Sequence, residues 1–168
     1  MNPKRNARIN EAATPIAIRV YPLKKEDTDS QSTTDRKFWR GPDALVVLDT
    51  ETRIDARQTL TFGSYRTIIQ GRRIEEGLFY SDNLSPRELQ TLRRYVRRRK
   101  PDVVPEGRQE IRLLPLREFL KEFYLDAYKT RCLVVGFNLP FDLSRLAFDV
   151  ADARRRYAGG FSLGLWTY

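Results

Sequence analysis

Two short apolar runs, each leading into acidic residues, constrain the fold of this chain more than any other feature. Residues 44–48 read Ala-Leu-Val-Val-Leu and pass directly into Asp49-Thr50-Glu51. Residues 132–137 form the second run, and Asp142 follows it closely. Apolar runs of this length that are rich in valine and leucine are typical of buried strands. We therefore predict an α/β domain in which two core strands end near carboxylates.

The spacing of the acids indicates a metal site. Side chains alternate across a strand, so Asp49 and Glu51 project from the same face. Asp142 lies where the second apolar run changes to a helical pattern, and we expect it to meet the other two acids at one edge of the sheet. Hard divalent cations prefer oxygen ligands. Three carboxylates at the ends of two strands are the ingredients of a two-metal phosphoryl-transfer site, with ions about 3.5–4 Å apart.

Simpler interpretations of these acids exist. An acidic pair after a strand is usually part of a solvated loop. Asp142 could also serve only to place a negative charge in the first turn of its helix, where the helix dipole favours an anion. The two motifs occurring together, in this order and each behind an apolar run, favour the metal site.

At these residues the chain resembles the DEDD superfamily of 3′→5′ exonucleases, which includes the proofreading domains of DNA polymerases and DnaQ-like nucleases. The first motif of that family, a strand ending in Asp-x-Glu, is matched by Asp49 and Glu51. The second motif, Asn-x-x-Phe-Asp, is matched by Asn138, Phe141 and Asp142. The resemblance covers about residues 44–156. It implies that Asp49, Glu51 and Asp142 are catalytic residues that bind Mg²⁺ or Mn²⁺, and that Thr50, Asn138 and Phe141 lie near the substrate; alternatively, Asn138 is a turn residue that bonds its own backbone.

The third motif of the family, which supplies a fourth carboxylate, has no match after Asp142. The pattern predicts a helix over residues 141–156, on which Asp149 and Asp152 would lie about 10.5 and 15 Å along the axis from Asp142, too far to share its metal ions. Residues 160–168 resemble an apolar strand without cover. We therefore expect an incomplete domain, finished by other sequence or by a protein partner that covers residues 160–168.

The charge balance favours a nucleic-acid partner. Lys and Arg total 31 against 22 Asp and Glu, a net charge of +9. A basic excess attracts polyanions. Many of the arginines fall on a helix predicted over residues 86–100, where the candidates for phosphate contacts are Arg93, Arg94, Arg97 and Arg98. A solvated helix face and a site for an acidic protein are the alternatives.

Other kinds of site and location are disfavoured. The chain has no histidine and one cysteine, Cys132, which argues against a zinc site and excludes a disulfide within the chain. Cys132 lies in an apolar run and is expected in the core. The sequence shows no apolar stretch long enough to span a membrane and no secretory signal, so we expect no membrane association and a cytoplasmic protein.

The elements expected along the chain suggest a ribonuclease H-like mixed sheet flanked by helices. We predict a flexible arm over residues 1–37, with a possible short strand near 16–23, and one domain over residues 38–168. Within the domain, an antiparallel meander is expected at 44–51, 59–69 and 73–80, followed by helices at 86–100 and 116–127, a strand at 132–137 and the helix at 141–156.

Three functions fit these observations. The first is a metal-dependent 3′→5′ exonuclease acting on DNA or RNA and completed by a partner or by further sequence. The second is a catalytically inactive module derived from such an exonuclease, which binds nucleic acid or scaffolds a larger complex. The third is another ribonuclease H-like enzyme, such as an endonuclease or a transposase relative. The Asp-x-Glu pair argues against the third, since those enzymes usually carry a single acid on the first strand.

Overall fold

The computed structural model describes residues 15–20, 42–99 and 107–167. The chain divides into two units, one formed by Leu23–Leu146 and the other by Met1–Pro22 together with Ala147–Tyr168. The expected arm over residues 1–37 lies mostly outside the described residues. Within the described ranges, no helix is both long and apolar enough to cross a membrane.

The larger unit is built on a five-stranded mixed sheet with the order β5-β4-β3-β2-β6. Strands β2 (Ala44–Thr52), β3 (Leu60–Ile69) and β4 (Arg72–Tyr80) form the expected antiparallel meander. The short strands β5 (Arg112–Pro115) and β6 (Leu133–Val135) add to its two sides, each parallel to its neighbour. Sequence patterns did not predict β5. The result is an α/β fold compatible with the expected ribonuclease H-like arrangement.

Strand β6 is an edge strand, which corrects the expectation that residues 132–137 form a buried core strand. It pairs with β2 through three residues, and within the described sequence no strand pairs with its other side. Leu133 and Val135 are therefore exposed, although Cys132 just before them is buried as expected. An apolar run predicts a strand but does not determine its place in the sheet, because that place depends on pairings with distant residues.

The main core lies between the sheet and helix α2 (Leu116–Tyr124), which continues into a π-helical turn at Leu125–Lys129. Phe119 is buried at the centre, with its ring stacked on Phe79 at 3.9 Å and tilted against Tyr65 at 5.1 Å. Glycine is required at Gly63 because an added Cβ would lie 2.1 Å from the Phe79 ring. Aromatic residues of α2 thus form part of the core of the larger unit.

An ion network ties α2 to the sheet beside this core. Arg112 of β5 donates to Glu75 of β4 at 2.9 Å and forms a bidentate pair with Glu122 of α2. Tyr65 donates its hydroxyl to the same Glu75 at 2.7 Å. Burial works against ionisation of Glu75, but the hydrogen bonds from Tyr65 and Arg112 hold its pKa below the usual value. The network links α2 to strands β4 and β5 of the sheet.

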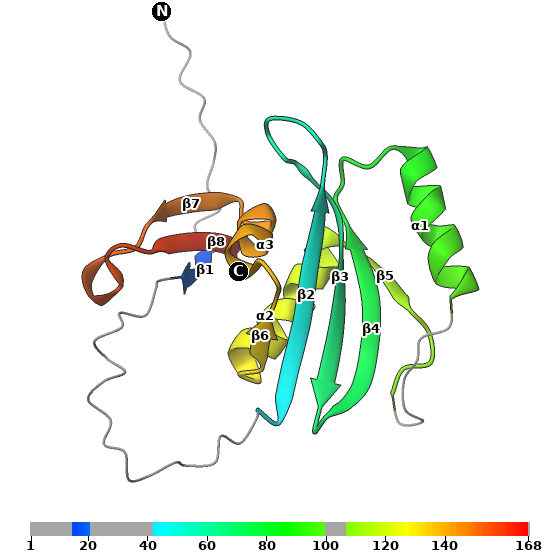
Figure 1. The fold of residues 1–168 in the computed structure, drawn as a ribbon, viewed down its shortest axis with the longest axis horizontal. Coiled ribbons are helices and arrows are strands. Elements are labelled where there is room, and N and C mark those ends of the chain that lie inside the picture. The colour runs from blue at the N-terminus through cyan, green and yellow to red at the C-terminus, as the bar shows by residue number, and fades with distance from the viewer. Residues whose placement is uncertain (1–14, 21–41, 100–106, 168) are drawn as a thin grey trace, which may run out of the picture. The chain divides into compact units, whose positions relative to one another are not determined.

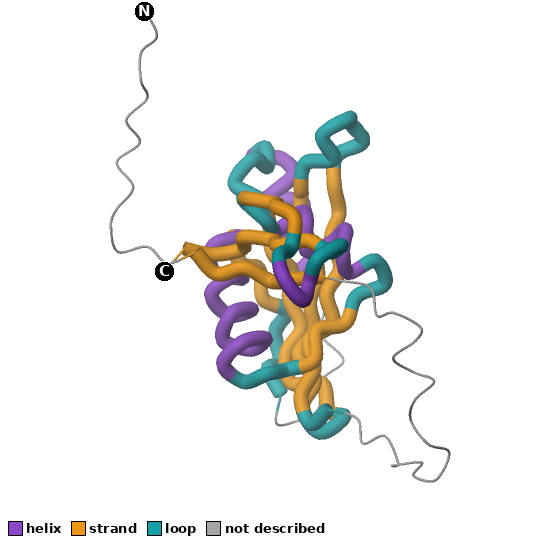
Figure 2. Tube along the Cα trace, turned by 90° about the vertical axis from the view of Figure 1, so that its left-hand side faces the viewer, coloured by secondary structure: helices purple, strands orange, loops and turns teal. Residues whose placement is uncertain are grey.

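Helix α1 (Pro86–Arg98) lies within the predicted range 86–100 and begins with a capping box. Ser85 accepts from the backbone N–H of Glu88 at 3.3 Å, and the Glu88 carboxylate accepts from the Ser85 N–H at 2.8 Å. Leu89, Leu92 and Val96 form its half-buried stripe. None of the residues of α1, all of which are described, is fully buried, so the helix lies at the margin of the unit (Figure 1). Figure 2 distinguishes the helices, in purple, from the strands, in orange.

Helix α3 (Leu139–Leu146) ends ten residues earlier than expected, so the prediction of a helix up to residue 156 was wrong. Residues Asp149–Asp152 instead form β7, which pairs with β8 (Phe161–Thr167). Asp149 and Asp152 are thus exposed strand residues and do not lie on an extension of α3. Pairing with β8 satisfies the backbone of these residues, which outweighs their helical spacing.

The smaller unit is a three-stranded antiparallel sheet in which β8 lies between β1 (Pro15–Val20) and β7. A short 3₁₀ turn at Arg155–Tyr157 connects β7 to β8. The short strand expected near residues 16–23 is confirmed as β1. Both edges of β8 are occupied, and Leu163 and Leu165 are buried. For residues 161–165 the expectation of missing cover was therefore wrong except at the exposed Phe161, because it ignored pairing with a strand more than a hundred residues away.

Candidate functional site

Strand β2 presents different residues on its two faces where it carries the acidic motif. Asp49 and Glu51 are both exposed, as their shared face predicted. Thr50 between them is buried on the other face, the one to which Val46 and Leu48 also belong. The two carboxylates of the first motif are thus free to bind a ligand from solvent, while Thr50 points inward.

Asp142 is anchored directly on this segment. Its Oδ1 atom accepts from the hydroxyl of Thr50 at 2.7 Å and from the backbone N–H of Thr50 at 3.1 Å. The side chain is only 2% exposed, in the first turn of α3, where its own N–H donates to the Asn138 carbonyl at 3.0 Å. The structure therefore brings the second motif into contact with the residue between the two acids of the first.

The other oxygen of Asp142 distinguishes this site from a helix cap. Oδ2 is buried and has no hydrogen-bond partner among the described residues. An unpaired buried carboxylate oxygen is costly, because burial removes its water without replacing it. A hard divalent cation is one ligand that offsets this cost, and carboxylate oxygens are the atoms it prefers. The donor set of Asp49, Glu51 and Asp142 thus fits Mg²⁺ or Mn²⁺ chemically.

The three carboxylates are nevertheless not assembled into a metal-binding cluster. In the described part of the chain, no group of three His, Cys, Asp or Glu side chains is arranged to hold an ion. The physical reason is the pleat of β2, because Asp142 contacts Thr50 while Asp49 and Glu51 project from the opposite face. The shared metal site remains a prediction.

Two arginines tie the surroundings of the motif together. Arg53, just after β2, forms a bidentate pair with Glu88 of α1, with N···O distances of 2.9 and 3.1 Å. This hydrogen bond, with those from Ser85, lowers the pKa of Glu88 to about 2. Arg145 of α3 donates to the carbonyls of Arg57 and Gln58 in the β2–β3 loop at 3.2 and 3.0 Å. Both helices are thus linked to the segment that follows Glu51.

The predicted substrate-binding residues lie around this segment with different exposures. Asn138 is exposed, and Phe141 is half-buried with the Arg145 guanidinium 4.9 Å above its ring. Phe137 is fully exposed, as is Ile54 after β2. Both follow the carboxyl ends of the parallel strands β2 and β6. Ligands commonly bind outside such strand ends.

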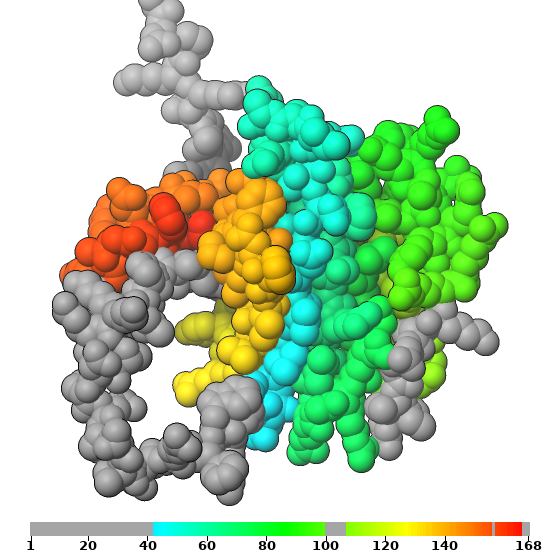
Figure 3. All heavy atoms as spheres, in the orientation of Figure 1, coloured from blue at the N-terminus to red at the C-terminus, as the bar shows by residue number. Residues whose placement is uncertain are grey.

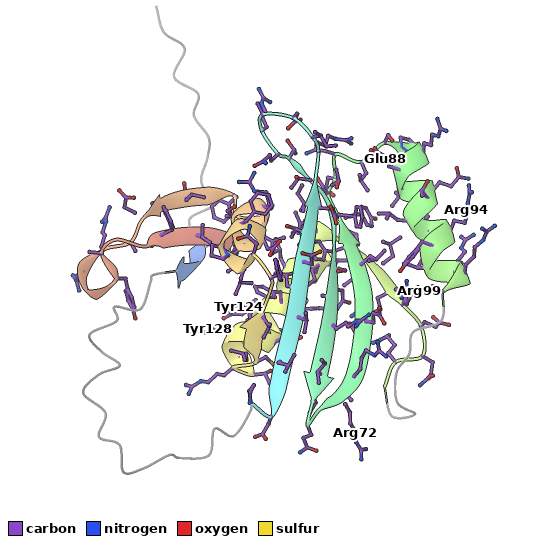
Figure 4. All side chains as sticks on the ribbon, in the orientation of Figure 1. Arg72, Glu88, Arg94, Arg99, Tyr124 and Tyr128 are labelled. Atoms are coloured by element: carbon purple, nitrogen blue, oxygen red, sulfur yellow. The ribbon has the colours of Figure 1, made fainter. Side chains whose placement is uncertain are left out.

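The four candidate arginines of α1 lie together on its outer side. Arg93, Arg94, Arg97 and Arg98 are exposed and line a surface groove of about 340 Å³ with Gln90. Arg94 points away from the sheet (Figure 4), and the helix forms an outer surface of the unit (Figure 3). Unlike Arg53, none of the four has an ion-pair partner in the described ranges. Their charges are therefore available to an anionic ligand.

The main role of Thr50 is to hold Asp142, which its sequence context did not predict. Threonine at this position was expected to contact substrate, but its hydroxyl and its N–H both donate to Asp142. The available signal was the alternation itself, since a polar residue on the buried face of a core strand needs an internal partner.

Comparisons with known proteins do not add a family assignment. No protein-family model matches this chain, and a search of curated proteins also finds no match. The functional interpretation therefore depends on the residues and contacts described above.

Proposed function

We propose that this chain is a ribonuclease H-like domain of the DEDD 3′→5′ exonuclease type, acting on DNA or RNA with Mg²⁺ or Mn²⁺. The observation that supports this proposal best is the anchoring of Asp142 on Thr50, since it joins the two motifs across 92 residues. The strand order β4-β3-β2-β6 is also in accord, with β2 antiparallel to β3 and parallel to β6.

Each residue of the proposed site has a distinct task. Asp49 and Glu51 offer exposed carboxylates to a cation, and Asp142 offers its unpaired Oδ2. Thr50 fixes the orientation of the Asp142 carboxylate through two hydrogen bonds. A divalent cation bound there would activate water and stabilise the leaving oxygen of a phosphodiester.

The surroundings suit a nucleic-acid strand. The exposed Phe137 and Ile54 offer apolar surface against which bases can stack or pack. Arg93, Arg94, Arg97 and Arg98 offer exposed guanidinium groups to phosphates. Among the described residues after Asp142 we assign no counterpart to the fourth carboxylate of the resembled family, since Asp149 and Asp152 belong to β7. We propose that sequence outside residues 1–168 or a partner protein supplies it for full activity.

A second candidate function is a catalytically inactive module that binds nucleic acid or scaffolds a complex. One observation favours it. Asp49 and Glu51 project from one face of β2, whereas Asp142 contacts Thr50 on the other face, and the described side chains form no three-residue metal group. In such a module Asp142 would serve only to hold α3 on β2.

Metal binding separates the two functions. We expect the purified chain to bind Mn²⁺ with millimolar affinity in an electron paramagnetic resonance titration, and Asp49→Asn and Asp142→Asn to lose that binding. Asp152→Asn is the matched control, because Asp152 is an exposed acid on β7 and should leave the titration unchanged. If Asp152→Asn also loses Mn²⁺ binding, the ions are held only by the general negative charge of surface carboxylates, and the proposed metal site is refuted.

Hydrolysis is the second part of the test. With the completing segment added, we expect metal-dependent shortening of a 5′-labelled single strand from its 3′ end, abolished by Asp49→Asn. A wild-type chain that binds single strands but neither binds Mn²⁺ nor shortens them would support the inactive module.

A further inference from the structure

A cavity of about 320 Å³ lies between α1 and the face of the sheet that carries Asp49. Its size is at the lower end of the range for small-molecule sites, about 300–1,000 Å³. Three adjacent strands form its floor, through Val47, Asp49, Ser64, Arg66, Glu76 and Leu78. Tyr95 and Arg99, at the carboxyl end of α1, line its other side. The cavity therefore begins at the first acid of the candidate metal site.

The charges of the described residues that line this cavity balance each other. Arg66 and Arg99 contribute two positive charges, and Asp49 and Glu76 contribute two negative ones. Arg66 is also paired with Glu76, with an N···O distance of 3.1 Å. A pocket without net charge is a poor trap for a phosphate, which needs unpaired cations or N–H groups. It suits an uncharged ligand that carries polar groups at its edge.

Tyr95 provides an aromatic side chain that the fold covers only in part. The residue is 42% exposed, and α1, described in full, fully buries none of its residues. The guanidinium of Arg99 donates to the Tyr95 hydroxyl at 2.7 Å and lies 5.6 Å from the ring centre. Arg99 lies on the side of α1 toward the sheet, unlike Arg94 (Figure 4). These contacts hold the ring at the cavity wall.

We propose that this cavity binds the nucleoside part of a nucleotide, with the base stacked on Tyr95. The proposal rests on the proposed function, because Asp49 belongs to both sites. A phosphodiester held near Asp49 and Glu51 would have its nucleoside within reach of the cavity. The flat base then lies between the Tyr95 ring and the apolar side chains of Val47 and Leu78. The Ser64 hydroxyl and the Asp49 carboxylate are partners for its amino or hydroxyl groups.

The test uses deoxyadenosine 5′-monophosphate and the full chain, with EDTA present so that no metal contributes. In a ¹H–¹⁵N NMR titration, we expect shifts of cavity residues and weak, saturable binding. Tyr95→Ala should weaken that binding about 5- to 150-fold, the range for losing one base–aromatic stack. Tyr95→Phe keeps the ring and should retain it. Tyr128→Ala is the matched control, since Tyr128 is an exposed tyrosine that does not line the cavity, and it should change affinity less than about twofold.

A second ligand identifies the part of the nucleotide that is recognised. Deoxyribose 5-phosphate lacks the base and should not produce the shifts. Equal binding of this sugar phosphate, equal binding by wild type and Tyr95→Ala, or no binding of the nucleotide by the wild type would each overturn the proposal. Far-UV circular dichroism checks that Tyr95→Ala is folded, which we expect because the side chain is not part of the core.

Failure of the cavity and failure of the proposed function give different results. Asp142 does not line the cavity, so Asp142→Asn should lose Mn²⁺ binding and keep nucleotide binding in EDTA. Nucleotide binding that depends on Tyr95, in a chain without Mn²⁺ binding, would retain the cavity and reject the nuclease. Mn²⁺ binding that depends on Asp49 and Asp142, without nucleotide binding, would support the metal site and reject the nucleoside cavity.

Discussion

Replacing Thr50 by valine tests the contact that joins the two motifs. The change removes the hydroxyl that donates to Asp142 at 2.7 Å and leaves a side chain of nearly the same shape. The acceptor is a carboxylate that is 2% exposed, and hydrogen bonds to charged groups contribute about 1.5–3 kcal/mol. We expect the free energy of unfolding to fall by that amount. The melting temperature should drop by about 3–12 °C, at 2–4 °C per kcal/mol for a chain of this size.

Thr61→Val is the matched control. The Thr61 hydroxyl also donates at 2.7 Å, but to the neutral, exposed backbone carbonyl of Glu51, so the loss should be about 0.5–1.5 kcal/mol. Urea unfolding followed by far-UV circular dichroism compares the two variants, with equal slopes required for the comparison. If Thr50→Val lowers the free energy of unfolding no more than Thr61→Val does, the buried hydrogen bond between Thr50 and Asp142 is refuted. The proposed site then loses its best support.

Three further predictions concern the frame around the site. Gly63→Ala should lower the free energy of unfolding, measured in urea, by about 1–3 kcal/mol, because the added Cβ would lie 2.1 Å from the Phe79 ring. Adding Phe79→Leu should relieve part of this clash, so the double variant should lose less than the sum of the two single losses. Strict additivity of the two losses would contradict this prediction. Arg112→Met should lower the free energy of unfolding by about 1–3 kcal/mol at pH 7, because the carboxylates of Glu75 and Glu122 lose the cation between them. An unchanged urea midpoint would mean that these ion pairs contribute no net stability. An NMR titration should give Glu88 a pKa of about 2. Its contribution to the free energy of unfolding should therefore be complete above pH 4.5 and be lost as the pH falls through 2. Arg53→Gln removes the main hydrogen-bond donor and should raise the pKa of Glu88.

Local patterns predicted the elements whose neighbours in the sheet are close in sequence. The meander of β2, β3 and β4 follows from alternating apolar runs with short connections, and the start of α1 follows from its capping box. These features depend on residues within a few positions of one another. The exposure of Asp49 and Glu51 on one face of β2 has the same origin, because a pleated strand fixes which side chains share a face.

Features that depend on distant partners could not be predicted in this way. Residues 149–152 have helical spacing to Asp142, but pairing with β8 makes them a strand. The apolar stretch at residues 161–167 gains its cover from β1, near the other end of the sequence. A single-sequence pattern contains no information on such pairings, because they are set by the free energy of the assembled sheet.

The candidate site shows the same division. The sequence by itself determined which carboxylates are present, that Asp49 and Glu51 share a face, and that Asp142 opens a helix. Only the tertiary structure decided that Asp142 is buried against Thr50, with one oxygen paired and the other left without a partner. The physical reason is that a hydrogen bond across 92 residues forms only when packing of α3 beside β2 has excluded water from both groups.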